Sequence, residues 1–152
     1  MPRRPPRSTL FPYTTLFRSW VQPRHGNYLQ TPLVTGGLLY GCTDYGLVTC
    51  FNAATGHIHY RERLKGRSQG FSASPVAAAG RLYFTGELGD VFVLRAGPDF
   101  ELLARNPLNE HCLATPALAH GRIVFRTRAH LVAIGDSHAA ASAASSFRAT
   151  SR

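Results

Sequence analysis

The feature that most constrains the fold of this chain is a segment that occurs three times. The copies read QTPLVTGGLLYGCTDYGLVTCF at 30–51, SASPVAAAGRLYFTGELGDVFVL at 72–94 and ATPALAHGRIVFRTRAHLVAI at 114–134. Their prolines, Pro32, Pro75 and Pro116, lie 43 and 41 residues apart. A period in the low forties with several short strands in each unit is typical of β-propeller blades. We therefore predict an all-β fold, a partial β-propeller of about three four-stranded antiparallel blades, with the last blade incomplete.

Short apolar runs bounded by Gly, Asp and Asn turns place the strands. We predict blades at about 28–64, 73–105 and 114–135. The expected strands are 28–34, 38–43, 47–52 and 57–64 in the first blade, 73–78, 81–85, 90–95 and 100–105 in the second, and 114–119, 122–127 and 130–134 in the third. The third blade lacks an outer strand. We expect the missing strand to come from the missing blades of the full-length chain.

The two ends of the chain differ from the repeats. Residues 1–19 read MPRRPPRSTLFPYTTLFRS, which resembles the translation of a common short-read sequencing adapter and differs from it only at Pro2. We exclude this segment from the fold, and with it any conclusion about a signal peptide. Residues 136–152 are rich in Ala and Ser and carry almost nothing to bury, so we expect a disordered tail.

The charge of the chain argues against a nucleic-acid surface. The formal net charge is +9, but Arg3, Arg4, Arg7 and Arg18 belong to the adapter-like segment. In the repeats, basic residues are mixed with acidic ones and are not packed into one run, which is typical of solvated strand faces. No apolar run approaches the roughly 20 residues of a membrane helix, so we expect no membrane span.

The segment that follows the third strand of the first blade, 51–60, reads FNAATGHIHY. It resembles the pattern A-x-D-x-x-T-G-x-x-x-W of pyrroloquinoline-quinone-like propeller repeats. This family includes bacterial quinoprotein dehydrogenases and the periplasmic outer-membrane assembly lipoprotein, and the resemblance covers 20–135. Because the repeat occurs in enzymes and scaffolds alike, the resemblance implies a fold more than an activity.

The resemblance also implies a set of blade-docking residues. In the family, the aromatic residue that closes the motif docks on the neighbouring blade. In this chain the motif residues are Asn52, Thr55, Gly56 and Tyr60, with Tyr in place of the usual Trp. Trp20 occupies the same position of a preceding blade. The second blade departs from the motif, since it has Ala-Gly-Pro-Asp-Phe in place of the Thr-Gly turn.

We find no constellation that commits the chain to a reaction. A quinoprotein enzyme requires an acidic cluster around calcium, a catalytic carboxylate and, in many members, two adjacent cysteines, and no such cysteine pair occurs here. The acids Asp44, Glu87 and Asp90 all fall at hairpin turns, where short acids bond local backbone amides. We therefore assign no catalytic, cofactor or metal residue, and we expect pyrroloquinoline quinone and calcium only in the full-length protein.

The histidines and the cysteines leave alternatives open. His57 and His59 point to the same side of an outer strand, as a metal pair would, but with no third ligand nearby we favour an exposed strand. His111, beside Cys112, lies between blades and would line the face of the ring, although we favour an ordinary loop position. Cys42 and Cys50 flank a turn, so a disulfide is conceivable and the strand register decides it.

The first hypothesis is a non-catalytic propeller scaffold of an exported bacterial protein, periplasmic or extracellular, whose loops bind another protein or a small ligand. The alternative is a fragment of a pyrroloquinoline-quinone-dependent dehydrogenase whose active site lies in the missing blades. A nucleic-acid-binding protein ranks third.

Overall fold

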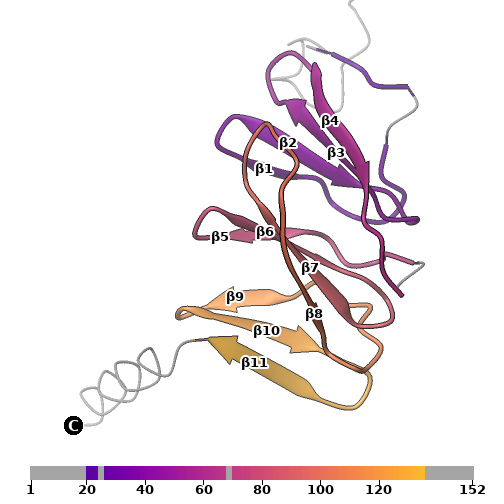
Figure 1. The fold of residues 1–152 in the computed structure, drawn as a ribbon, viewed down its shortest axis with the longest axis vertical. Helices are drawn as coiled ribbons and strands as arrows, with labels where there is room; N and C mark the ends of the chain where they lie inside the picture. Colours follow the sequence, from indigo (N-terminus) through magenta and orange to yellow (C-terminus); the bar gives the residue numbers. More distant parts are fainter. Residues whose placement is uncertain (1–19, 24–25, 68–69, 136–152) are drawn as a thin grey trace, which may run out of the picture.

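The computed structural model describes residues 20–23, 26–67 and 70–135. The predicted adapter-like segment and the predicted tail lie outside these residues. The described residues form three antiparallel sheets that follow one another along the chain (Figure 1). No helix in this part of the chain is long and apolar enough to cross a membrane.

The sheets contain four, four and three strands, each in sequence order. The first comprises β1 (Leu33–Thr35), β2 (Leu38–Cys42), β3 (Leu47–Asn52) and β4 (Ile58–Arg63). The second comprises β5 (Val76–Ala78), β6 (Arg81–Thr85), β7 (Asp90–Arg95) and β8 (Leu102–Pro107). The third comprises β9 (Ala117–Ala119), β10 (Arg122–Arg126) and β11 (Leu131–Gly135). The predicted all-β architecture of three antiparallel blades, the last without a fourth strand among the described residues, is confirmed.

The first strand of every blade is shorter than predicted, with three residues in each case. Each begins directly after one of the repeated prolines, Pro32, Pro75 and Pro116. Proline has no backbone N–H and cannot donate to the ladder, so it lies before the strand and not within it. Strand β8 begins two residues later than predicted, and just before it Arg95 N of β7 donates to Glu101 O at 3.0 Å.

The first hairpin of each blade closes with a tight turn at the same repeat position. Its two central residues have positive φ in all three copies: 57° and 75° at Gly36 and Gly37, 49° and 70° at Ala79 and Gly80, and 49° and 71° at His120 and Gly121. Two successive residues in this region match the twist of a two-residue hairpin. The repeated glycine of the sequence is therefore the second residue of this turn.

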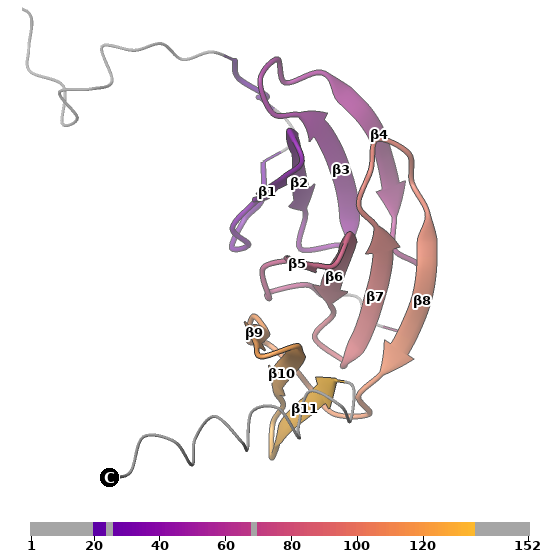
Figure 2. The same ribbon diagram turned by 90° about the vertical axis from the view of Figure 1, so that its left-hand side faces the viewer.

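Hydrophobic contacts between blades make up the core. Figure 2 shows the short strands β1, β5 and β9 on one side of a fan and the outer strands β4 and β8 on the other. Between the first two blades, buried residues such as Tyr40, Cys50 and Val48 pack against Leu82, Phe84, Phe92 and Leu94. A smaller cluster joins the second and third blades through Val91, Cys112 and Phe125. The second sheet therefore buries both faces, and the first and third sheets each bury the face that lies against it.

The strand register answers the question of the disulfide. Cys42 pairs with Val48, and Cys50 pairs with Tyr40, so the two cysteines do not face each other across the ladder. Both are free thiols, as is Cys112, and all three are buried. Burial raises the pKa of the Cys42 thiol to about 12, with a further contribution from Asp44, and burial raises the pKa of Cys50 to about 11.

These thiols predict a loss of stability at alkaline pH. In the unfolded chain a thiol ionises near pH 8.5, whereas in the folded chain Cys42 and Cys50 stay neutral well above that value. The stabilisation is therefore complete below about pH 8.5 and declines as pH rises toward the folded pKa values. We expect the urea midpoint to fall between about pH 8 and pH 10.5, and to fall less in the Cys42→Ala, Cys50→Ala double variant. An equal fall in both proteins would contradict this assignment.

Candidate functional site

The turn between β3 and β4 is built by the motif residues that the sequence singles out. Asn52 Oδ1 accepts hydrogen bonds from the backbone N–H groups of Ala54 and Thr55, both at 3.0 Å. Gly56 N donates to Asn52 O at 2.8 Å. Thr55 Oγ1 accepts from His57 N at 3.3 Å. A short polar side chain that holds the amides two and three residues ahead is the usual Asx arrangement, and here it closes the turn.

Trp20 lies on this turn. Its indole N–H donates to Ala53 O at 2.9 Å, and its ring stacks on Phe51 at 6.0 Å between centroids. A Cβ atom on Gly56 would lie 2.6 Å from Trp20 Cδ2, and Gly56 has a φ of 73°. Gln22 Nε2 adds a bond to Gly56 O at 2.8 Å. Gly56 is therefore required both by the turn geometry and by the close approach of the indole ring.

Tyr60 reaches the second blade. Its ring contacts Phe100 edge to face, with centroids 5.5 Å apart. Tyr60 pairs laterally with Cys50, which pairs with Tyr40, so the three side chains share the face that packs on the second blade. Burial raises the pKa of the Tyr60 phenol, and its hydroxyl has no partner within the described residues. The motif thus has two aromatic contacts, Trp20 on the first blade and Tyr60 on the second.

Tyr40 makes an inter-blade contact that the sequence analysis missed. Its hydroxyl donates to Gly97 O at 3.2 Å and accepts from Gly97 N at 2.8 Å. Gly97 lies in the turn of the second blade that departs from the family motif. A phenol that both donates and accepts satisfies two backbone groups of that turn. Because the contact joins positions 57 residues apart, no local pattern reveals it.

The residues before the three repeated prolines join the blades on the inner side. Thr31 N donates to Ser74 Oγ at 2.8 Å, and Ser74 N donates to Thr115 Oγ1 at 2.9 Å. Each bond runs from one repeat to the next at the same repeat position. The sequence shows these hydroxyls only as small polar residues beside a proline.

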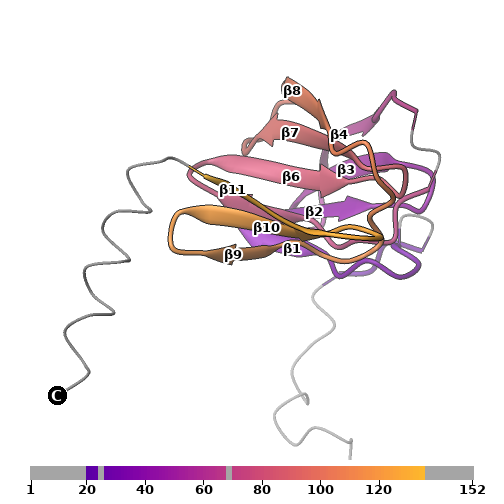
Figure 3. The same cartoon turned by 90° about the horizontal axis from the view of Figure 1, so that it is seen from below.

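The connections between blades lie over the turns between the second and third strands of each blade. We call this end of the molecule the loop face; it is at the right in Figure 3. Leu64 N donates to Gly46 O at 2.9 Å, and Leu108 N donates to Gly89 O at 2.8 Å. Farther along, Phe71 N bonds Asp44 O and Cys112 N bonds Glu87 O. The described ends of both connections are therefore fixed to the hairpin beneath them.

The acids of the loop face bind groups of the chain itself. Asp90 is completely buried and accepts from Arg105 Nη2 at 2.8 Å and from Arg67 N at 2.9 Å. Glu87 accepts from the Ser72 hydroxyl. Glu110 contacts His130 Nδ1 at 2.8 Å. A hydrogen bond from Thr127, with smaller contributions from His130 and Ala129, lowers the pKa of the Glu110 carboxyl.

Asp90 lies where it was predicted, beside the hairpin turn at the start of the third strand, but its carboxylate is completely buried and binds Arg67 and Arg105. Asp90 is the first residue of β7, and it pairs with Pro107 of β8. Asp44 remains partly exposed in its turn, as expected.

The histidines do not form a metal site within the described part of the chain. His57 and His59 are exposed, and their rings meet edge to face at 5.6 Å. No group of three or more His, Cys, Asp or Glu residues there is arranged to hold a metal ion. His111 is exposed, and its carbonyl accepts from Arg128 N at 2.8 Å.

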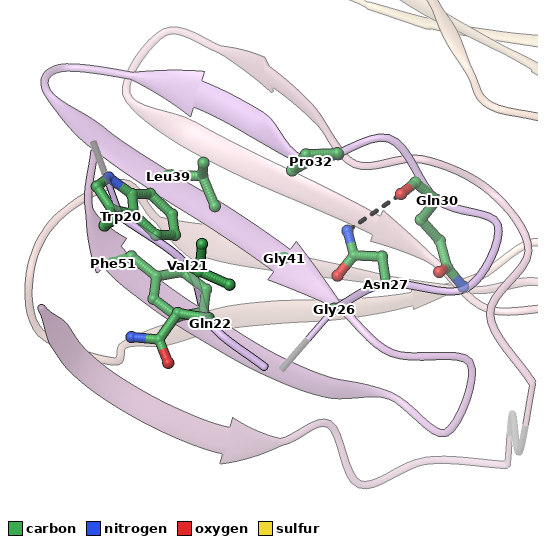
Figure 4. A pocket seen from close by; sticks show the side chains of 10 residues that line it. All are labelled: Trp20, Val21, Gln22, Gly26, Asn27, Gln30, Pro32, Leu39, Gly41 and Phe51. Atoms are coloured by element: carbon green, nitrogen blue, oxygen red, sulfur yellow. Dashed lines mark hydrogen bonds between the residues drawn. The ribbon is translucent and has the colours of Figure 1, made fainter. Parts of the chain in front are cut away.

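A cavity of about 470 Å³ lies on the face of the first blade that points away from the second (Figure 4). Trp20, Phe51 and Leu39 supply its apolar wall, and Asn27 and Gln30 lie at its polar end. Gln30 is buried and donates to Phe71 O, while its Oε1 has no partner within the described residues. This face of the first blade is not covered by another described blade.

Comparison with known proteins supports the fold. The chain is similar to BamB from Moraxella catarrhalis, with a TM-score of 0.56 and 18% identity over 68% of this chain and 30% of that chain. The fold is that of a β-propeller. Quinohemoprotein alcohol dehydrogenases from Pseudomonas putida HK5 and from Comamonas testosteroni are also similar, each with a TM-score of 0.59. Their identities are 12% and 13%, over 70% and 74% of this chain.

This chain spans only 18% and 20% of those two dehydrogenases. No protein-family model and no curated protein matches the sequence. At these identities the propeller neighbours show the fold that the sequence resemblance implies, and they do not show an activity.

The contact between Gly56 and Trp20 predicts a specific result. The Gly56→Ala variant should lower the melting temperature and shift Trp20 fluorescence to longer wavelength, because the added Cβ displaces the indole into water. Gly36→Ala is the matched control, since Gly36 also has positive φ but nothing within 4 Å of the added Cβ. The control should lose only about 1 kcal/mol from backbone strain, with unchanged emission. Equal emission in both variants would contradict the contact.

Proposed function

We propose that this chain is part of a non-catalytic β-propeller scaffold from an exported bacterial protein, periplasmic or extracellular, whose loop face binds another protein or a small ligand. The observation that carries the proposal is the fixed loop face. Each described connection there is tied to the hairpin below it by backbone hydrogen bonds. Loops held on a rigid sheet scaffold are the usual place for recognition.

We propose in addition that Trp20, Asn52, Thr55, Gly56 and Tyr60 dock neighbouring blades. Three contacts support this role: the indole on the Gly56 turn, the Asn52 cap of that turn, and the Tyr60 ring on Phe100. Such contacts hold one sheet against the next, so they set the shape of the loop face and do not themselves bind a partner.

A second candidate is a fragment of a pyrroloquinoline-quinone-dependent dehydrogenase, with the active site in blades outside this sequence. It is favoured by the similarity to two quinohemoprotein alcohol dehydrogenases. The described residues do not fit the cofactor with its calcium ion, which requires about six to eight oxygen ligands. Asp90, the most buried acid, already binds two arginines, and Glu87 binds Ser72.

The test uses the full-length protein that contains residues 20–135. We expect no absorbance change on addition of pyrroloquinoline quinone with calcium, and no dye-linked oxidation of alcohols. Cross-linking with mass spectrometry should place a bound protein on the connections at 64–75 and 108–116. Alcohol oxidation that depends on the quinone would overturn the scaffold proposal in favour of the enzyme.

A further inference from the structure

The first connection between blades is longer than the second. Five residues, 65–69, separate Leu64 from Gly70, whereas two residues, 109–110, separate Leu108 from His111 at the same repeat positions. The hydrogen bonds of Leu64 and Leu108 to equivalent glycines establish this alignment. Insertions into single repeats of such arrays often form the binding surface.

The described part of the longer connection, 65–67, is basic, and Gly66 lies close against the second blade. Arg63, Lys65 and Arg67 occur within five residues, with no acid among them. All three are exposed. A Cβ on Gly66 would lie 2.6 Å from Phe92 Cζ and 3.1 Å from Asp90 Oδ2. Glycine therefore lets the backbone approach the blade and fixes the position from which Arg67 extends.

Asp90 organises two arginines from different elements. Besides accepting from Arg67 N, its carboxylate lies 2.8 Å from Arg105 Nη2 and 3.7 Å from Arg67 Nη2. The equivalent residues in the other blades are Leu47 and His130, whose carbonyls close the same turn between the second and third strands. The propeller repeat does not require a carboxylate here, so Asp90 serves a feature of this blade alone.

The two arginines carry more charge than Asp90 neutralises. Two guanidinium groups share one carboxylate, which leaves a net charge of about +1 at the site. The Arg67 side chain is 60% exposed and the Arg105 side chain is 37% exposed, whereas that of Asp90 is 0% exposed. The Arg105 guanidinium also lies 5.8 Å from the centre of the Phe92 ring. The two guanidinium groups thus contact Asp90 on their buried side and are exposed to solvent on the opposite side.

A cavity of about 510 Å³ adjoins these guanidinium groups. It is lined by Arg67, Asp90, Arg105, Pro107 and Asn109. We propose that Arg67 and Arg105, positioned by Asp90, bind a carboxylate of an acidic segment of a partner protein. This inference rests on the proposed function, because it names the chemistry that the loop face recognises.

The planar guanidinium suits this ligand, since its N–H groups match the two oxygens of a carboxylate. A nucleic acid fits less well. Among the described residues that line the cavity, none is aromatic and able to stack a base, and the basic residues of the repeats do not form a continuous track.

The test measures binding of a fluorescent hexaglutamate peptide to the full 152-residue chain, with hexaglutamine as the neutral probe. We expect hexaglutamate to bind and hexaglutamine not to bind. Arg67→Gln and Arg105→Gln should each weaken binding about tenfold, the effect of losing one hydrogen-bonded charge pair. Arg81→Gln is the matched control, because Arg81 is an exposed arginine at the opposite end of the second blade, and it should change binding less than about twofold.

Two further variants separate a built site from a general basic surface. Asp90→Asn removes a negative charge, so a general basic surface would bind the peptide more tightly. The proposed site should bind it more weakly, because the arginines lose their anchor. Arg67→Lys keeps the positive charge but removes the planar guanidinium that can bond both carboxylate oxygens, so it should weaken binding several-fold. Melting and Trp20 emission establish folding of each variant, and Arg67→Lys decides alone if Asp90→Asn does not fold.

Equal binding by wild type, Arg67→Gln and Arg67→Lys would overturn the inference, as would no binding of hexaglutamate. Tighter binding of a single-stranded oligonucleotide, lost in the same variants, would replace it by a nucleic-acid site. Failure here is distinguishable from failure of the scaffold proposal. Quinone-dependent oxidation by the full-length protein would contradict the scaffold proposal without affecting peptide binding at this site. Conversely, if Arg67 and Arg105 do not bind the peptide, the scaffold proposal still stands when a partner protein cross-links elsewhere on the loop face.

Discussion

Alanine in place of Phe92 should lower the free energy of unfolding by about 3 to 5 kcal/mol, the range for removing a buried aromatic ring. Phe92 is completely buried between the first two blades, and its ring lies 5.8 Å from that of Phe71. Gly66 and the Arg105 guanidinium also lie against this ring. Removal of the ring therefore leaves a cavity within the core and beneath Gly66 of the longer connection. Urea unfolding followed by far-ultraviolet circular dichroism measures the loss.

The control for this prediction is Leu131→Ala. Leu131 is 73% exposed, so its truncation should cost less than about 0.5 kcal/mol. A loss of similar size in the two variants would mean that the contact between the first two blades is not the main source of stability. It would also contradict the assignment of the core to the space between sheets.

Self-association of the 152-residue chain is the second large effect we expect. The outer faces of the first and third blades are not covered by another described blade. Val34 is 60% exposed on the face of the first blade that carries Leu39 and Phe51. Leu131 lies on the face of the third blade opposite to Phe125, which packs on the second blade. Exposed apolar faces of sheets associate readily in water.

The Val34→Lys, Leu131→Lys double variant should shift the chain from oligomers toward monomer at about 10 µM, because each lysine would have to be buried on association. Size-exclusion chromatography with light scattering measures the mass. The matched control is Leu88→Lys with Leu102→Lys, which adds equal charge at exposed apolar positions outside the two end faces. A wild-type chain that is a soluble monomer with a sharp two-state melt would contradict the prediction.

The repeat period and the turn residues made most of the fold predictable. Strands β3, β6 and β7 have the bounds that the segments between turn residues predicted. These inner strands are covered on both faces, so each contains a central apolar run that is easy to recognise. The first strand of each blade was predicted too long. The repeated proline ends the backbone hydrogen bonding of the strand, but it does not interrupt the apolar sequence pattern from which the strand was predicted.

The candidate site was predictable only in part. The Asn52 turn is local, with partners two and three residues away, so its motif is visible in the sequence. Asp90 was correctly placed beside a hairpin turn at the start of the 90–95 strand, where a short acid is expected to bond local backbone amides. Its true partners, Arg67 and Arg105, come from other elements and meet it only when the blades stack. The contact of Tyr40 with Gly97 was missed for the same reason.

The chain of hydroxyl contacts from Thr31 to Ser74 to Thr115 has a consequence for assembly. In the first two repeats a backbone amide donates to a hydroxyl of the following repeat, so the bonds run in one direction along the chain. A further unit that joins after Thr115 would continue this series if it had Ser or Thr ahead of its own proline. This gives a residue-level criterion for which sequences are compatible neighbours of this array.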